Sequence, residues 1–132
     1  SQFIRKKIRL EYEPVQYTVL TDEKWLMFVI EQIISNSLKY TRQGFIAITF
    51  EKEGVLCIRD SGIGIDAADI PRVFDKGFTG LNGRTDKKAT GIGLYLCRRI
   101  LTALGHDIQI SSSEGKGTEV RIDLSRSDVN VE

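Results

Sequence analysis

The spacing of apolar residues along the chain predicts two long helices. Between residues 22 and 40, apolar side chains recur at three- and four-residue steps, which is the pattern of a helix with one buried face. Asp22 precedes this run and is the expected N-cap, and the helix should end before Gly44. A second helix is expected over residues 91–104, with Gly105 as its C-cap.

Alternating apolar and polar residues predict strands around these helices. The expected strands are two short ones within residues 7–20, a hairpin of residues 45–50 and 55–60, and a final pair near residues 107–112 and 118–124. Residues 66–75 are predicted to form a short helix, and the polar tail over residues 126–132 should fray. Residues 76–90 contain many glycines and few apolar side chains, so a mobile loop is expected there.

Three helices and several strands in this order predict an α+β fold, with the helices on one face of a mixed sheet. The 132 residues suit one domain that covers the whole chain. A net charge of only +1 argues against a nucleic-acid-binding protein, which needs an excess of basic residues. The longest apolar run is too short for a helix that spans a membrane.

The cysteines and the histidine do not point to a metal centre. Cys57 and Cys97 lie forty positions apart within apolar stretches, and we expect them to be buried free thiols. His106 is the only histidine and follows Gly105, so we expect it in a turn or in the core. These three scattered side chains do not have the spacing of a zinc site.

Two glycine groups stand out as candidate chemistry. Asp60-Ser61-Gly62-Ile63-Gly64 directly follows a predicted strand, and Thr90-Gly91-Ile92-Gly93-Leu94 opens a predicted helix. The N-terminus of a helix has free N–H groups that suit a phosphate. Either group alone is compatible with a simple turn, but both together beside a basic loop favour a phosphate-containing ligand.

The segment Gly62–Ala67 also fits the dinucleotide-binding pattern G-x-G-x-x-A. This alternative is disfavoured because Asp60 would place its charge close to a pyrophosphate. The helix that follows is also too short for a standard crossover, and the second glycine group would have no role.

The Asp60 carboxylate is better suited to recognising a nucleotide base than to lying beside a pyrophosphate. It can accept a hydrogen bond from the exocyclic amine of adenine and would repel the carbonyl of guanine, so it favours ATP over GTP. On the first predicted helix, Asn36 lies one turn after Gln32, and its amide oxygen suits Mg²⁺. Lys39 can neutralise phosphate charge, and Tyr40 can pack near the nucleotide.

Together these motifs resemble the five boxes of the histidine-kinase ATP-binding domain. In order, they are Asn36–Thr41 (N box), Asp60–Gly64 (first glycine box), Phe74–Phe78 (F box), Gly91–Leu94 (second glycine box) and Gly115–Thr118 (third glycine box). The resemblance implies a Bergerat-type α/β sandwich with a largely antiparallel sheet and ATP under a flexible lid at about residues 76–90. Gyrase, Hsp90 and MutL share this fold.

The resemblance also implies roles for single residues. Asn36 would hold Mg²⁺, Asp60 would recognise adenine, and Thr118 would support the adenine end. The whole set implied to bind the nucleotide is Asn36, Lys39, Tyr40, Asp60, Gly62, Gly64, Ile65, Phe78, Lys87, Lys88, Thr90, Gly91, Ile92, Gly93, Leu94 and Thr118. On the lid, Arg84 or the Lys87-Lys88 pair could reach the γ-phosphate.

The catalytic candidates are Glu31, Gln32, Lys39 and Arg84. ATP-hydrolysing relatives place a glutamate one turn before the Mg²⁺ asparagine, where this chain has Gln32. Glutamine cannot take a proton at neutral pH, so water should be activated poorly. Glu31 lies about 100° round the helix from that position, and its role stays open.

The segments Asp22–Leu26, Lys76–Gly80 and Asn82–Arg84 resemble a subgroup of these kinases, the bacitracin-sensing intramembrane-sensing kinases of Gram-positive bacteria. This likeness implies a cytoplasmic domain of an integral membrane protein that works beside an ABC transporter. We expect a monomeric catalytic domain without its dimerisation, phosphoacceptor and membrane domains. It would transfer the γ-phosphoryl group of ATP to a histidine on the separate dimerisation domain, for relay to a response regulator. An ATPase clamp of the Hsp90 or MutL type and an interaction module without nucleotide are the alternatives.

Overall fold

The computed structural model describes residues 8–12, 21–41, 43–51, 54–78 and 93–125. Its strands are β1 (Ile8–Tyr12), β2 (Gly44–Glu51), β3 (Val55–Asp60), β4 (Asp107–Ser113) and β5 (Gly117–Asp123). Its helices are α2 (Glu23–Tyr40), α4 (Gly93–Ala103) and the single 3-10 turn η1 (Ile70–Arg72). In this part of the chain, no helix is long and apolar enough to cross a membrane.

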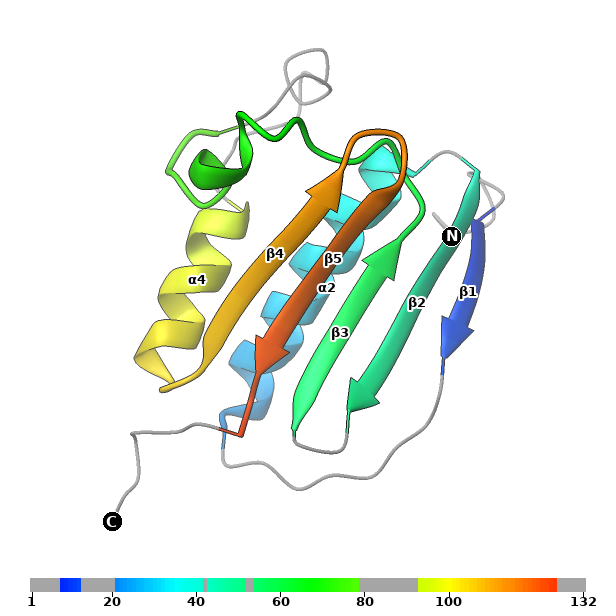
Figure 1. Ribbon diagram of the computed structural model, residues 1–132. Coiled ribbons are helices and arrows are strands. Elements are labelled where there is room, and N and C mark those ends of the chain that lie inside the picture. Colours follow the sequence, from blue (N-terminus) through cyan, green and yellow to red (C-terminus); the bar gives the residue numbers. More distant parts are fainter. Residues whose placement is uncertain (1–7, 13–20, 42, 52–53, 79–92, 126–132) are drawn as a thin grey trace.

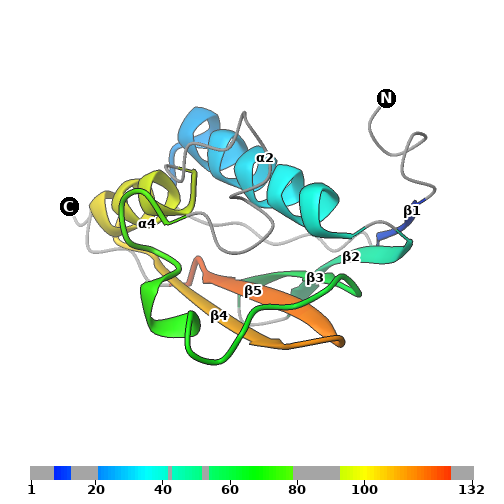
Figure 2. The ribbon, with the colours of Figure 1, turned by 90° about the horizontal axis from the view of Figure 1, so that it is seen from above.

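The five strands form one sheet in the order β1-β2-β3-β5-β4. The β1–β2 pair is parallel, and the other three pairs are antiparallel. Helices α2 and α4 lie side by side on one face of the sheet (Figures 1 and 2). The predicted α+β fold with a mixed, largely antiparallel sheet is therefore confirmed.

Each long helix has a defined end that its sequence explains. The Asp22 carboxylate accepts a hydrogen bond of 3.1 Å from the backbone N–H of Trp25, which makes Asp22 the predicted N-cap of α2. At the end of α4, the N–H of His106 donates to the carbonyl of Leu101 at 2.8 Å, and Gly105 has a φ of 82°. This is a Schellman-type C-cap, for which a glycine at this position is suited.

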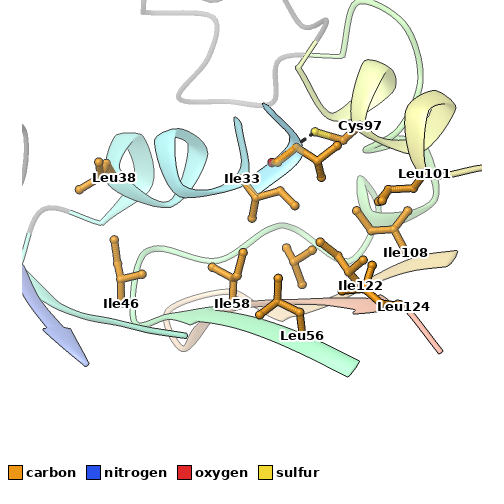
Figure 3. Close-up of a cluster of buried hydrophobic side chains, with 12 residues drawn as sticks. Ile33, Leu38, Ile46, Leu56, Ile58, Cys97, Leu101, Ile108, Ile122 and Leu124 are labelled. Carbon is orange, nitrogen blue, oxygen red and sulfur yellow. Dashed lines mark hydrogen bonds between the residues drawn. The ribbon is translucent and has the colours of Figure 1, made fainter. Parts of the chain in front are cut away.

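The hydrophobic core fills the space between the helices and the sheet. Figure 3 shows Ile33 and Leu38 of α2 directed towards Ile58 and Ile46 of the sheet, all of them buried. From α4, Leu101 and Cys97 complete this layer, and both are fully buried. Because side chains alternate along a strand, the register that buries Leu56 and Ile58 also turns Asp60 towards the helices.

The predicted short helix over residues 66–75 was wrong in extent, since the segment forms turns and only the three residues of η1 are helical. The Asp66 carboxylate accepts a 3.0 Å hydrogen bond from the N–H of Ala68, and Pro71 has no N–H to donate. Both features compete with the hydrogen bonds of an α-helix. The second predicted strand of the N-terminal region, most of the predicted loop and the predicted frayed tail lie outside the described residues.

Candidate nucleotide-binding site

The components of the site gather at one end of the sheet, the upper end in Figure 1. Strand β3 and helix α2 end there, the β4–β5 turn lies there, and the described part of α4 begins there. The segment after β3 runs along this end (Figure 1). Motifs far apart in the sequence are therefore brought to one edge of the molecule.

Asp60 is a buried carboxylate at the end of β3, only 6% exposed. The backbone N–H of Gly62 donates a 2.9 Å hydrogen bond to its Oδ1 atom. Burial raises the pKa of Asp60, and the hydrogen bond from Gly62 offsets part of this rise. Hydrogen bonds from the Ser37 side chain, the Thr118 backbone N–H and the Thr41 hydroxyl offset the rise further.

Gly62 joins the end of β3 to the end of α2. A Cβ atom at this position would collide with the carbonyl oxygen of Tyr40 and would lie 2.6 Å from the Thr41 hydroxyl. The next residue, Ile63, donates its N–H to the same Tyr40 carbonyl at 3.1 Å. Thr41 is fully buried, and its hydroxyl lies against the Asp60 carboxylate, whose pKa it helps to lower.

A row of residues across three strands forms the floor of the site. In the sheet register, Asp60 of β3 pairs with Thr118 of β5, and Thr118 pairs with Ser112 of β4. The Oγ atoms of Ser112 and Thr118 lie 2.8 Å apart. Directly opposed residues share a face of the sheet, so Thr118 stands beside the Asp60 carboxylate.

The loop after Asp60 is fixed to the β4–β5 turn. The N–H of Ile65 donates to Ser112 Oγ at 2.8 Å, and the N–H of Gly115 donates to the carbonyl of Ile63 at 2.7 Å. Gly64 has a φ of 79°, and a Cβ atom there would collide with the carbonyl of Ser113. A glycine is therefore required where the first glycine group approaches the third.

The first turn of α4 meets α2 at Gln32. A Cβ atom on Gly93 would lie 3.1 Å from the Gln32 amide oxygen. Asn36 follows one helical turn later on the same side of α2, and both side chains are half-buried. The second glycine group and the predicted Mg²⁺ ligand are thus on facing helices.

The other described candidates take different positions. Lys39 Nζ lies 5.9 Å from the centroid of the Tyr40 ring, and both side chains are half-buried near the end of α2. Leu94 packs against the core, and the Arg72 guanidinium lies 5.6 Å from the Phe78 ring centroid. Glu31 is exposed. The remaining predicted residues, Arg84, Lys87, Lys88, Thr90, Gly91 and Ile92, lie outside the described residues.

Two further expectations concern residues outside this site. His106 is buried, and its Nε2 atom lies 2.8 Å from the Thr21 hydroxyl, which confirms a structural position next to the α4 C-cap. Cys57 and Cys97 are both buried free cysteines, as predicted. The residue that the sequence did not reveal is Ser112, because only the β4–β5 register places it beside Thr118.

The family of the chain follows from comparison with known proteins. A family model described as "Histidine kinase-, DNA gyrase B-, and HSP90-like ATPase" matches residues 21–128. This is most of the chain, and the chain therefore belongs to this ATPase family.

Curated relatives narrow the likeness to sensor kinases. The chain is 44% identical over 110 residues to the sensor histidine kinase YxdK of Bacillus subtilis, which covers 80% of this chain and 34% of YxdK. It is 40% identical over 121 residues to the sensor protein BceS of the same organism, covering 89% of this chain and 36% of BceS. The chain thus spans about a third of the length of these relatives, and the predicted resemblance to sensor histidine kinases is confirmed.

Solved structures agree on the fold. The mycobacterial sensor histidine kinase MprB matches with a TM-score of 0.76 at 19% identity, over 92% of this chain and 85% of that chain. The catalytic domain of the histidine kinase ThkA matches with a TM-score of 0.75 at 23% identity, over 92% of this chain and 82% of that chain. Full-length ShkA in complex with AMPPNP matches with a TM-score of 0.73 at 20% identity, over 98% of this chain and 28% of that chain.

Proposed function

We propose that this chain is the ATP-binding catalytic domain of a sensor histidine kinase. It would bind ATP and transfer the γ-phosphoryl group to a histidine on a separate dimerisation domain. The observation that carries the proposal is the buried Asp60 carboxylate, which lies at the same end of the sheet as the facing helices of Gln32 and Gly93. Membership of the ATPase family supports it.

Asp60 and Thr118 would recognise the adenine ring. Asp60 can accept a hydrogen bond from the exocyclic amine, whereas guanine presents a carbonyl to the same acceptor. A buried polar group that loses its partner costs about 1–3 kcal/mol, which is enough to favour ATP over GTP.

The triphosphate would extend towards the first turn of α4. The N–H groups at a helix start are not used within the helix, and Gly93 has no side chain to block access to them. Asn36 would hold Mg²⁺ through its amide oxygen together with phosphate oxygens, where the ion would neutralise phosphate charge. Lys39 would add a positive charge, and Tyr40 would pack near the nucleotide.

The residues that accompany Asn36 favour a kinase over an ATPase. Gln32 can orient a group by hydrogen bonding but cannot remove a proton from water. ATP would therefore persist until a phosphoacceptor is positioned in line with the γ-phosphate. By likeness to the family, Arg84, Lys87 and Lys88 would approach the γ-phosphate from the lid.

The phosphoacceptor is expected outside this chain. His106 is buried, hydrogen-bonded to Thr21 and adjacent to a helix cap, so it does not suit an exposed acceptor. The acceptor histidine would lie on the parent's dimerisation domain, and the phosphoryl group would pass to a response regulator. By likeness to the kinase subgroup, the parent would be membrane-anchored with this domain in its cytoplasmic part, and an ABC transporter would be its partner. The isolated domain should be a monomer.

A phosphotransfer assay tests this function. The chain is mixed with the dimerisation segment of its parent kinase and ATP labelled at the γ-phosphate. We expect label on the dimerisation segment as an acid-labile, base-stable phosphohistidine. Replacing the acceptor histidine, or Asn36→Ala in this chain, should abolish it. Release of ADP and free phosphate without labelled protein would instead favour an ATPase clamp, and no Mg-ATP binding would favour an interaction module.

A further inference from the structure

We propose that Ser112 is a positioning residue for base recognition, because it fixes the direction in which the Thr118 hydroxyl points its proton. This inference rests on the proposed binding of adenine at Asp60 and Thr118. It assigns to Ser112 a role in nucleotide selectivity, although Ser112 itself need not touch the nucleotide.

Three polar groups surround the Ser112 hydroxyl. The backbone carbonyl of Gly117 lies 2.8 Å from Ser112 Oγ, and a carbonyl can only accept. The single proton of Ser112 is therefore donated to Gly117. The backbone N–H of Ile65 also lies 2.8 Å away, and it can only donate, so it occupies a lone pair of the same oxygen.

The third neighbour of Ser112 is Thr118, with its Oγ1 atom at 2.8 Å. Taken alone, this contact permits either oxygen to be the donor. Since the proton of Ser112 is already committed to Gly117, Thr118 must donate in this pair. The hydroxyl proton of Thr118 is then held towards Ser112, and its remaining lone pairs are left as acceptors.

The direction of the Thr118 proton determines which edge of a purine base the site accepts. Thr118 is the cross-strand neighbour of Asp60 on the helix-facing side of the sheet. With the Thr118 proton held away, both groups act as acceptors towards a base. A purine with an amine at position 6 matches this pair, whereas a purine with a carbonyl there meets acceptors only. If Ser112 were absent, the Thr118 hydroxyl could rotate and donate to that carbonyl.

Ser112 also ties this arrangement to the loop after Asp60. The hydrogen bond from Ile65 links the loop to β4, and a second link runs from the Gly115 N–H to the Ile63 carbonyl at 2.7 Å. Because this second link does not use Ser112, the loop keeps one attachment when the serine hydroxyl is removed. Loss of the hydroxyl should therefore alter Thr118 more than it alters the fold.

The chain supplies matched controls in its run of three serines. Ser111 and Ser113 flank Ser112 on β4, and both are exposed, whereas Ser112 is half-buried. Alternation along the strand turns both side chains to the opposite face from Thr118. Ser111→Ala and Ser113→Ala therefore change the same residue type without touching the network.

The test measures dissociation constants for Mg-ATP and Mg-ITP by calorimetry, since the two bases differ by an amine or a carbonyl at position 6. We expect Ser112→Ala to lower the preference for ATP over ITP about tenfold, the effect of about one hydrogen bond. The Ser111 and Ser113 variants should stay within about twofold of wild type. Equal weakening of both nucleotides by Ser112→Ala, with the preference unchanged, would mean a merely structural role and would overturn the inference.

A second variant keeps the test decisive if Ser112→Ala unfolds. Thr118→Val removes the directed hydroxyl but leaves Ser112 in place, and it should lower the same preference by a similar factor. Thr118→Ser should restore the preference, and unchanged selectivity in Thr118→Val would overturn the inference. If wild-type protein binds ATP while these variants keep its selectivity, only this inference fails. If wild type binds neither nucleotide, the proposed function fails and this inference fails with it.

Discussion

The amide oxygen of Gln32 on α2 lies 3.1 Å from the point that a Cβ atom on Gly93 of α4 would occupy. The two helices therefore approach closely at the end of the sheet where Asp60 is buried. Gln32 stands where ATP-hydrolysing relatives have the glutamate that activates water, and Gly93 belongs to the second glycine group. The contact therefore brings these two motifs together.

Gly93→Ala should separate folding from nucleotide binding. Alanine favours a helix over glycine by up to about 1 kcal/mol, and the flexible end of Gln32 can move aside, so the fold should be retained. The added methyl group would displace Gln32 and narrow the approach to the helix start, which should weaken Mg-ATP binding about tenfold. Thermal unfolding and calorimetry measure the two effects, with Ala103→Gly at the other end of α4 as the control. Unchanged affinity in Gly93→Ala would contradict a phosphate site here.

Gln32→Glu should convert the chain into a better ATPase. A carboxylate at this position supplies the general base that glutamine lacks, so ATP hydrolysis without an acceptor should rise at least about tenfold. Glu23→Gln is the control, because Glu23 is an exposed glutamate at the other end of α2 and its loss should leave basal hydrolysis unchanged. A coupled assay for ADP release measures both variants. A Gln32→Glu protein that binds ATP without faster hydrolysis would count against this interpretation of Gln32.

Asp60→Asn should stabilise the fold while it weakens ATP binding. The isosteric amide can still accept the hydrogen bond from Gly62, and it removes a buried charge. Loss of the acceptor for adenine should raise the dissociation constant for ATP about tenfold or more and affect GTP less. Calorimetry with both nucleotides, together with thermal unfolding, tests this. Equal loss of ATP and GTP binding would contradict adenine recognition by Asp60.

The same variant has a defined pH dependence. Burial raises the pKa of Asp60 in the folded protein above its value of about 3.9 in the unfolded chain. The folded state therefore keeps a proton that the unfolded state has lost, and the contribution of Asp60 to the free energy of unfolding falls as pH rises. The decline begins near pH 4 and ends above the raised pKa. Urea unfolding should show the advantage of Asp60→Asn over wild type growing across this range, and a shrinking advantage would refute it.

Both thiols should be inert in the folded protein. Burial raises the pKa of Cys57 to about 11 and that of Cys97 to about 12. At pH 8 about one Cys57 thiol in a thousand and about one Cys97 thiol in ten thousand is then the reactive thiolate, compared with roughly a quarter for an ordinary cysteine. Titration with an aromatic disulfide reagent should detect both cysteines quickly in urea and neither quickly in buffer. Rapid reaction of one thiol in folded protein would contradict the burial of that residue.

Cys57 illustrates what the sequence could and could not predict. Its apolar surroundings predicted a buried thiol, and this was confirmed. Its partners depend on pairing between distant strands: Arg121 donates to Cys57 Sγ at 3.1 Å and to a Glu51 oxygen at 2.7 Å. No local pattern joins residues from three strands, so this polar cluster on the outer face could not be found before the fold was known.

The candidate site also contains residues that the sequence predicted and residues that could be found only in the fold. Asp60, Asn36 and the glycine groups were found because their residue types and spacing carry the chemistry. The need for glycine at position 117 became clear only in the fold, where a Cβ atom would collide with the carbonyl of Asp60. Ser112 was missed for the same reason, since its role depends on the β4–β5 register. Local competition from the Asp66 side chain also explains why the helix predicted over residues 66–75 was too long.

The central claim is that one ATP molecule contacts both the loop after Asp60 and the first turn of α4. A nitrogen-15 NMR titration with Mg-AMPPNP tests it most directly, because Gly62 and Gly93 report on the two places through their own amide signals. We predict that both signals shift along one saturation curve with the same dissociation constant, and that Asp60→Asn weakens both responses together. A shift at only one glycine, or at neither, would contradict the account.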